Sequence, residues 1–133
     1  MGKMDISEIN AFFKEYAQAY LAFNSNMLTK FFNFPSIIHD LSGVHLLKNA
    51  GDLKIYEELF LENLEQKKIV KIENELLAYD FSQQLPNAIA CKLAYKLFDV
   101  NNQLIIDFDY AYSLIKNEVW QILFARLGAV RKY

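Results

Sequence analysis

The sequence predicts an α+β domain in which helices cover one face of an antiparallel sheet. Two observations lead to this prediction. Apolar residues recur at helical spacing over the first half of the chain, and from Ile69 onward apolar and polar residues alternate as they do in strands. A group of helices followed by a group of strands is typical of the α+β class. The length of 133 residues fits a single core, so we expect one domain spanning residues 1–133.

Capping residues mark the first two helices. Asp5 and Glu8 have the spacing of a capping box, so the first helix is expected to begin there. Its buried face is expected to carry apolar residues three or four positions apart: Ile6, Ile9, Phe13, Tyr16, Tyr20 and Phe23. The Asn-Ser-Asn cluster at 24–26 interrupts this helix and can cap a short second helix that ends before Pro35. The buried side of the second helix would be Leu28, Phe31 and Phe32.

A third helix is expected after Asn49 and Asp52, which can cap its first turn. Its periodicity divides the helix into an apolar face and a charged face. The inner face is predicted to carry Leu53, Tyr56, Leu59, Phe60 and Leu64, and the outer face Lys54, Glu57, Glu58 and Glu62. Before this helix, apolar runs on both sides of Ser42-Gly43 predict a small pair of strands within residues 36–48.

Four longer strands are expected in the second half of the chain, at about 69–80, 86–99, 103–116 and 119–127. Turn signals at Pro86, Asn101-Asn102 and Asn117-Glu118 separate them, which indicates an antiparallel meander. In the second of these strands Cys91 falls on the apolar face, so we interpret it as a small buried hydrophobic residue.

Composition and charge disfavour several classes of protein. The formal net charge is −2 and the basic residues are scattered, which argues against nucleic-acid binding. No run of about eighteen apolar residues suggests a membrane span, and no secretory signal is visible. With Cys91 as the single cysteine we expect a cytoplasmic protein. A chain with four glycines and no glycine-rich loop predicts no nucleotide cofactor, and His39 and His45 lack the spacing of a metal site.

Several segments resemble the nuclear transport factor 2-like (NTF2-like) superfamily over nearly the full chain. They are Tyr16 and Tyr20 in the first helix, the segment 26–32 (NMLTKFF), Gly43-Val44-His45, and the hairpin 110–122 (YAYSLIKNEVWQI). The resemblance implies a cone in which three N-terminal helices pack on a strongly curved mixed or antiparallel sheet, with a pocket between them. The superfamily includes ketosteroid isomerases, SnoaL-type polyketide cyclases and scytalone dehydratase. It therefore implies a small hydrophobic ligand and isomerase, cyclase or dehydratase-type acid/base chemistry.

The resemblance also selects candidate catalytic residues. Tyr16 and Asp40 fall where ketosteroid isomerases place their oxyanion-hole tyrosine and their general-base aspartate, so Asp40 is expected to face the pocket within reach of Tyr16. Ala111 stands about where that family has its neutral carboxylic acid. The alternative is that Tyr16 is a core tyrosine of the helix and Asp40 caps the turn before Gly43. If the segment is a strand, only one of His39 and Asp40 can enter the pocket.

The expected ligand-binding residues are aromatic side chains and one arginine. They are Tyr20, Tyr56, Tyr95, Trp120 and Arg126. Arg126 lies among apolar residues of the last strand, where its guanidinium would bind either a ligand carboxylate or a structural Asp. A two-residue turn at Asn117-Glu118 would place Asp109 opposite Arg126.

The strand from Leu104 is apolar on both faces, which leads to a second functional hypothesis. A sheet covered by helices on one face only would leave an apolar outer surface. We therefore expect a homodimer through the sheet. A non-catalytic homodimeric or partner-binding module is the alternative to the small-molecule pocket.

Overall fold

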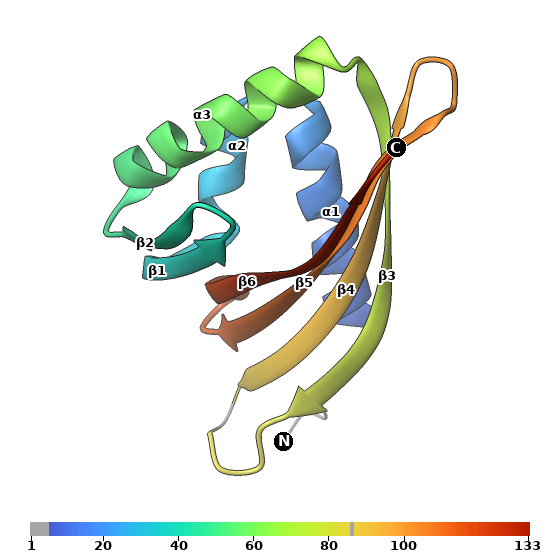
Figure 1. Cartoon of the computed structure of the whole chain (residues 1–133). Helices are drawn as coiled ribbons and strands as arrows, with labels where there is room; N and C mark the ends of the chain where they lie inside the picture. Colours follow the sequence, from blue (N-terminus) through green and yellow to red (C-terminus); the bar gives the residue numbers. More distant parts are fainter. Residues whose placement is uncertain (1–5, 86) are drawn as a thin grey trace.

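The computed structural model describes residues 6–85 and 87–133, and it has the predicted α+β architecture. The helices α1, α2 and α3 lie on one side of a strongly curved sheet (Figure 1). They span Ile6–Leu21, Ser25–Thr29 and Ala50–Gln66. The strands β1 to β6 span Phe32–Asp40, Gly43–Leu47, Ile69–Phe81, Ala88–Asp99, Leu104–Lys116 and Trp120–Lys132. Asp5 and Pro86, the expected helix start and turn marker, lie outside the described residues.

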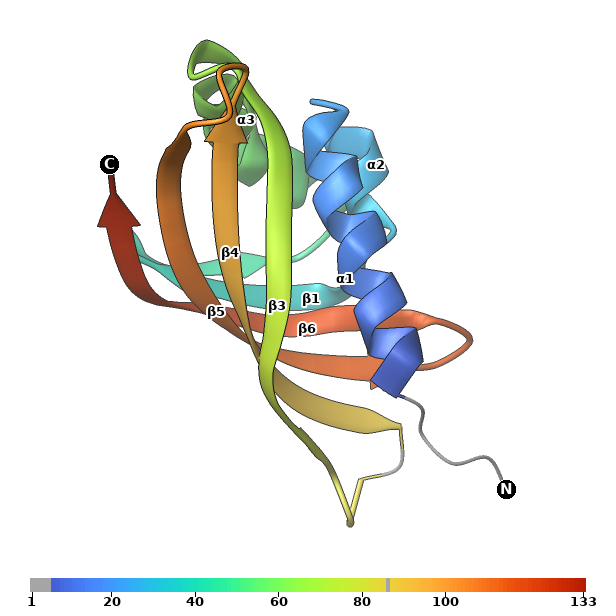
Figure 2. The ribbon, with the colours of Figure 1, turned by 90° about the vertical axis from the view of Figure 1, so that its right-hand side faces the viewer.

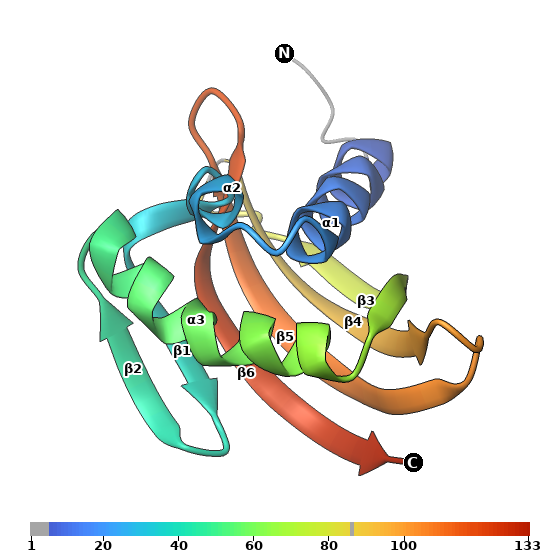
Figure 3. The same cartoon turned by 90° about the horizontal axis from the view of Figure 1, so that it is seen from above.

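The sheet has six strands in the order β2-β1-β6-β5-β4-β3. Strands β3 to β6 form the predicted antiparallel meander, and β1 and β2 form the predicted pair. β1 begins earlier than expected, at Phe32, because α2 ends at Thr29 and Phe32 is therefore a strand residue rather than part of the second helix. β1 joins the meander by parallel pairing with β6, so the sheet is mixed. Because β2 and β3 are the two edge strands, α3, which connects them, has to cross the whole sheet. Seen from above, α3 spans the strands as a roof (Figure 3).

Local irregularities accompany the curvature of the sheet. The register shifts between Leu76 and Ala78 in β3, at Leu97–Phe98 in β4 and between Phe108 and Tyr110 in β5. Bulges of this kind bend a strand and increase its twist. The long strands therefore wrap around α1, which packs against the concave side along β3 (Figure 2).

Asparagine caps fix the ends of the helices as the sequence predicts. The side chain of Asn24 accepts a hydrogen bond from the backbone N–H of Asn26 at the start of α2. Asn49 accepts from the backbone N–H of Asp52 at 3.0 Å, and Asp52 accepts from the backbone N–H of Lys48 at 2.9 Å. The first bond is an N-cap, the second holds the residue before the cap, and together they set where α3 begins.

One hydrophobic core joins the helices to the concave face of the sheet. Ile9, Phe13 and Tyr16 of α1 pack in a cluster with Leu93 and Tyr112 of the sheet. Cys91 belongs to the same cluster, and burial raises the pKa of its thiol to about 12, so it is buried as the sequence predicts. None of the described helices is long and apolar enough to cross a membrane.

The last hairpin differs from its prediction in register. Lys116 pairs with Trp120, which leaves the three residues 117–119 in the turn, where a two-residue turn was expected. A further shift at Ser113–Leu114 leaves Leu123 unpaired, so Arg126 lies opposite Ala111. The predicted Asp109–Arg126 pair is therefore wrong. Asp109 instead lies 4.0 Å from the ammonium of Lys92.

Candidate functional site

A cavity of about 570 Å³ lies between α3 and the concave face of the sheet. Side chains from α1, α3, the β1–β2 hairpin, β4, β5 and β6 line it, and most of them are aliphatic or aromatic. Several rim residues are both cavity-lining and exposed: Leu41, Ile55, Leu59 and Phe60. The cavity is therefore open to solvent past an apolar rim, a shape common to small-molecule sites.

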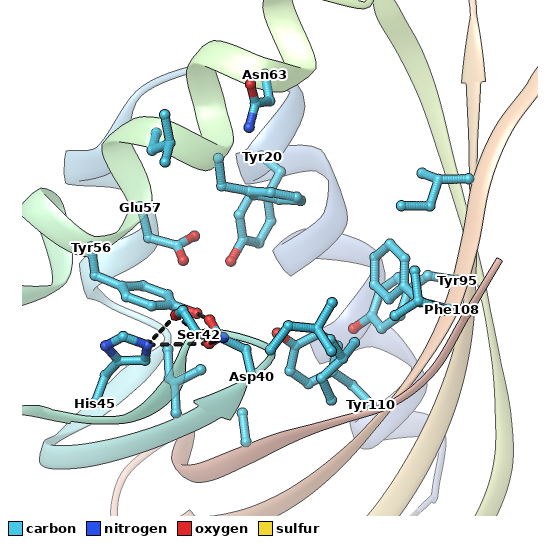
Figure 4. A pocket seen from close by; sticks show the side chains of 18 of the residues that line it. Tyr20, Asp40, Ser42, His45, Tyr56, Glu57, Asn63, Tyr95, Phe108 and Tyr110 are labelled. Atoms are coloured by element: carbon cyan, nitrogen blue, oxygen red, sulfur yellow. Dashed lines mark hydrogen bonds and ion pairs between the residues drawn. The ribbon is translucent and has the colours of Figure 1, made fainter. Parts of the chain in front are cut away.

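Asp40 is fixed at the end of β1 by four hydrogen bonds. Its Oδ1 accepts from the backbone N–H of Ser42 at 2.9 Å and from the Ser42 hydroxyl at 2.6 Å, and it lies 3.1 Å from His45 Nε2. The hydroxyl of Tyr56, on α3, donates to Oδ2 (Figure 4). Burial alone would raise the pKa of Asp40, but the hydrogen bonds from Ser42, Tyr56 and His45 outweigh it and lower the pKa to about 2. Asp40 is thus ionised and well satisfied.

Glu57 is the second carboxyl group in the cavity, and its environment is the opposite of that of Asp40. Glu57 is 3% exposed to solvent, and its Oε2 has no hydrogen-bond partner among the described residues. In Figure 4 its carboxyl group points from α3 toward the hydroxyl of Tyr20. Burial raises the pKa of Glu57 to about 7; a hydrogen bond from Tyr20 opposes the rise and the charge of Asp40 adds to it.

Two pairs of tyrosines complete the polar part of the cavity. The hydroxyls of Tyr16 and Tyr20 lie 2.9 Å apart on α1, and those of Tyr95 and Tyr112 lie 2.8 Å apart on adjacent strands. Burial raises the pKa of each of these hydroxyls, so all four are neutral at physiological pH. The cavity therefore offers neutral hydroxyls and two carboxyl groups to a bound molecule.

Five of the seven residues selected from the sequence line this cavity. They are Tyr16, Tyr20, Asp40, Tyr56 and Tyr95. Asp40 both faces the cavity and caps the turn before Gly43, so the two alternatives drawn from the sequence hold together. Its tyrosine hydrogen-bond partner is Tyr56, whereas the hydroxyl of Tyr16 pairs with Tyr20. His39 is exposed and is not among the cavity-lining residues, as the alternation along β1 requires.

Trp120 and Arg126 lie outside the cavity. Trp120 is buried at the start of β6, where the ammonium of Lys116 lies 5.9 Å from its ring. Ala125 lines the cavity, so its neighbour Arg126 points to the opposite face of the sheet, where it is exposed. The guanidinium of Arg126 therefore does not reach this cavity.

Glu57 is the main residue that sequence reasoning placed wrongly. It was assigned to the outer face of α3 because glutamate is seldom buried. The buried residues of α3 are in fact Leu53, Glu57, Leu61 and Leu64, with steps of four, four and three. Leu53, Leu61 and Leu64 already mark this stripe in the sequence. Glu57 lies one helical turn from both Leu53 and Leu61, so the spacing alone would have placed it on the buried face. His45 lies opposite Ile38 in the β1–β2 pair and also lines the cavity beside Asp40.

Other sites for a ligand or a metal are weaker. A second hollow of about 660 Å³ lies at the far end of the sheet, between the β3–β4 turn and β5. Its one ionisable side chain is Asp80, which is exposed. Among residues 6–85 and 87–133, no group of three or more His, Cys, Asp or Glu is placed to hold a metal ion.

The fold is that of NTF2-like proteins, as the solved structures of similar shape show. An NTF2-like protein of unknown function from Shewanella oneidensis matches 95% of this chain and 100% of its own, with a TM-score of 0.71 and 11% identity. A domain of unknown function with a cystatin-like fold from Nostoc punctiforme matches 96% of this chain and 78% of its own, with a TM-score of 0.74 and 16% identity.

A third similar structure is a putative calcium/calmodulin-dependent protein kinase II association domain from Xanthomonas campestris. It matches 96% of this chain and 89% of its own, with a TM-score of 0.68 and 15% identity. At these identities the likeness extends to the fold and no further. Comparison of the sequence with protein-family models and with curated proteins gives no match.

Proposed function

We propose that the protein binds a small, largely apolar molecule in the cone cavity and carries out acid/base chemistry on it. The observation that carries this proposal is the placement of Glu57, a buried carboxyl group with an unpartnered oxygen, inside a cavity of about 570 Å³ with mostly apolar walls. Cavities of this size enclose ligands of one or a few rings. A carboxyl group that titrates near neutral pH is suited to both accept and return a proton.

The two carboxyl groups have different roles in this proposal. Asp40, with its pKa lowered to about 2, is a weak base and serves to hold Tyr56 and the β1–β2 turn in place. Glu57, with its pKa raised to about 7, is the group that exchanges the proton. The hydroxyls of Tyr16 and Tyr20 form a neutral hydrogen-bonded pair next to Glu57. When it turns away from Tyr20, the O–H of Tyr16 becomes a donor to a ligand oxygen that gains negative charge. Tyr16 and Asp40 thus stay in the proposed site, with the proton transfer moved to Glu57.

Ligand binding can be tested without knowing the natural ligand. Native mass spectrometry of the purified protein should show a co-purified small molecule, and the neutral dye Nile red should gain fluorescence with the protein. Leu127 lines the cavity, so Leu127→Trp should reduce dye binding at least tenfold. Val119→Trp, in the exposed turn just before the same strand, is the matched control. Equal loss in both variants, or no loss in Leu127→Trp, would contradict the proposal.

A second function, assembly through the sheet, is favoured by the outer face of β1, β6 and β5. Ile37 of β1 is 37% exposed and pairs with Phe124 of β6, which pairs in turn with Ser113 of β5. This row of apolar and small side chains faces away from the helices, because its neighbours Ile38 and Ala125 line the cavity. We propose that the row forms a homodimer interface. The similarity to an association domain agrees with this proposal.

A further inference from the structure

We propose that the ligand of the cone cavity is an amine with an apolar body, whose ammonium group binds the free oxygen of Glu57. The inference rests on the small-molecule binding in the proposed function and names the class of ligand. Because a bound ammonium lowers the pKa of a carboxyl group, it replaces the proton-transfer role of Glu57 with a binding role. It is carried by the geometry of the charged groups around the cavity.

The carboxyl group of Glu57 lacks a hydrogen-bond donor for one of its oxygens. Its Oε2 is buried and has no hydrogen-bond partner among the described residues, although the residue lines an open cavity. The carboxylate of Asp40, by contrast, already accepts hydrogen bonds from Ser42, Tyr56 and His45. A buried carboxylate oxygen without a donor is costly, and a charge-assisted hydrogen bond from an ammonium is among the strongest that could satisfy it.

Among residues 6–85 and 87–133, no lysine or arginine forms an ion pair with Glu57. The charged and titratable side chains that line the cavity are Asp40, His45, Glu57 and Lys132, together with the tyrosines of α1, α3, β4 and β5. His45 lies beside Asp40, and Lys132 is exposed near the end of β6. Two carboxyl groups without a buried counter-ion favour a cationic ligand and disfavour an anionic one.

Aromatic rings next to Glu57 suit the same ligand. The ring of Tyr20 lies 5.0 Å from that of Tyr16 and 5.5 Å from that of Phe60, and all three residues line the cavity. Aromatic faces attract an ammonium group and also pack against an apolar body. A ligand with its ammonium at Glu57 would therefore place the rest of the molecule among the apolar side chains of the sheet and of α3.

The test compares three probes of similar size and different charge. They are 2-phenylethylamine, 2-phenylethanol and 3-phenylpropanoate, each titrated into the full chain at pH 8 by calorimetry. We expect the amine to bind at least tenfold more tightly than the alcohol, and the carboxylate to bind more weakly than the alcohol. Lowering the pH from 8 to 5 should reduce the preference for the amine, because Glu57 becomes protonated over that range.

Variants assign the preference to one residue. Glu57→Gln keeps the shape of the side chain and should bring the affinity for the amine down to that for the alcohol. Glu58→Gln is the matched control, because Glu58 is the next residue of α3 and is exposed. Circular dichroism checks that both variants fold, and the pH series on the unaltered protein gives an answer that needs no variant.

The outcomes separate this inference from the proposed function. Binding of the alcohol without a preference for the amine, or a preference that persists in Glu57→Gln, overturns the amine inference and leaves the small-molecule cavity standing. If none of the three probes binds, and Nile red also fails to bind, the small-molecule function itself is wrong and the inference falls with it.

Discussion

Two carboxyl groups of one cavity, Asp40 and Glu57, have pKa values displaced in opposite directions. Four hydrogen bonds stabilise the charged form of Asp40, whereas burial with an unpartnered oxygen favours the neutral form of Glu57. Carboxyl groups separated in this way can act at the same pH as one fixed charge and one proton carrier. The difference follows from the number of donors that the local backbone and side chains direct at each group.

The stability of the protein should fall as the pH rises from about 4.5 to about 7. The folded pKa of Glu57 is raised from 4.5 to about 7, so its contribution is present below the unfolded value and is lost as the pH passes the folded one. At about 1.4 kcal/mol per pKa unit, the loss is roughly 3 kcal/mol. Urea unfolding at pH 5 and pH 8 measures it. Glu57→Gln should flatten this dependence and Glu58→Gln should keep it; an unchanged slope in Glu57→Gln would refute the assignment.

Asp40→Asn should destabilise the protein by about 1–2 kcal/mol, because charge-assisted hydrogen bonds to Ser42, His45 and Tyr56 are weakened. The contribution of the charged form is present above pH 3.8 and is lost as the pH falls through about 2. Urea midpoints of both proteins at pH 7 measure the first effect, and those of the parent protein between pH 4 and pH 2 measure the second. Asp80→Asn, at an exposed site on β3, is the control and should change little. A stable Asp40→Asn protein would show that the turn does not depend on the charge.

The sequence predicted cavity-lining residues correctly where the residue type and the position on the helix both indicated burial. Tyr16, Tyr20 and Tyr56 are aromatic, lie on helical stripes and line the cavity. Glu57 was not predicted to line the cavity. A glutamate is usually exposed to solvent, whereas the position of Glu57 between Leu53 and Leu61 on the helix indicates burial. A local rule that fails in this way is expected at a functional site, where stability is given up for chemistry.

At the scale of the element, the helices were easier to predict than the pairing of the strands. Asn24 and Asn49 carry the capping signals, and α2 and α3 begin where those signals predict. The register of the last hairpin was not predictable from alternation, since a three-residue turn and the unpaired Leu123 shift it without a visible mark in the sequence. This shift moved Asp109 away from Arg126.

The Asn49 cap at the start of α3 should contribute measurably to the free energy of unfolding. Asn49→Ala removes the acceptor for the backbone N–H of Asp52 and should cost about 1 kcal/mol. The urea midpoint should fall accordingly, with an unchanged m-value. Asn117→Ala, in an exposed turn, is the control for removing an asparagine. If both variants lost the same amount, the cap would not be the cause.

At the scale of the whole molecule, the order of elements predicted the α+β class, and the resemblance of several segments to a known superfamily predicted the NTF2-like fold. Helices first and long alternating strands afterwards leave few arrangements in which one sheet face is covered. The outer face that remains carries Ile37, paired with Phe124, and Leu123, which is 38% exposed. Such a surface is a candidate interface.

Sedimentation velocity at micromolar concentration should report a homodimer. Ile37→Glu places a charge in the middle of the proposed interface and should shift the protein to a monomer, because an unpaired buried charge is costly. Val119→Glu, in the exposed β5–β6 turn, adds the same charge outside the interface and should leave the dimer intact. A monomeric parent protein, or dissociation caused equally by both variants, would rule out the interface.

Because α3 is attached to both edges of the sheet, the lining of the cavity can change through this helix alone. One helix of 17 residues supplies six of the lining side chains: Ile55, Tyr56, Glu57, Leu59, Phe60 and Asn63. Because its two ends are held by β2 and β3, its inner face can change while the strands keep their pairing. Exchanging the inner-facing residues of α3 between two proteins of this fold should therefore exchange their ligand preferences without disturbing the sheet.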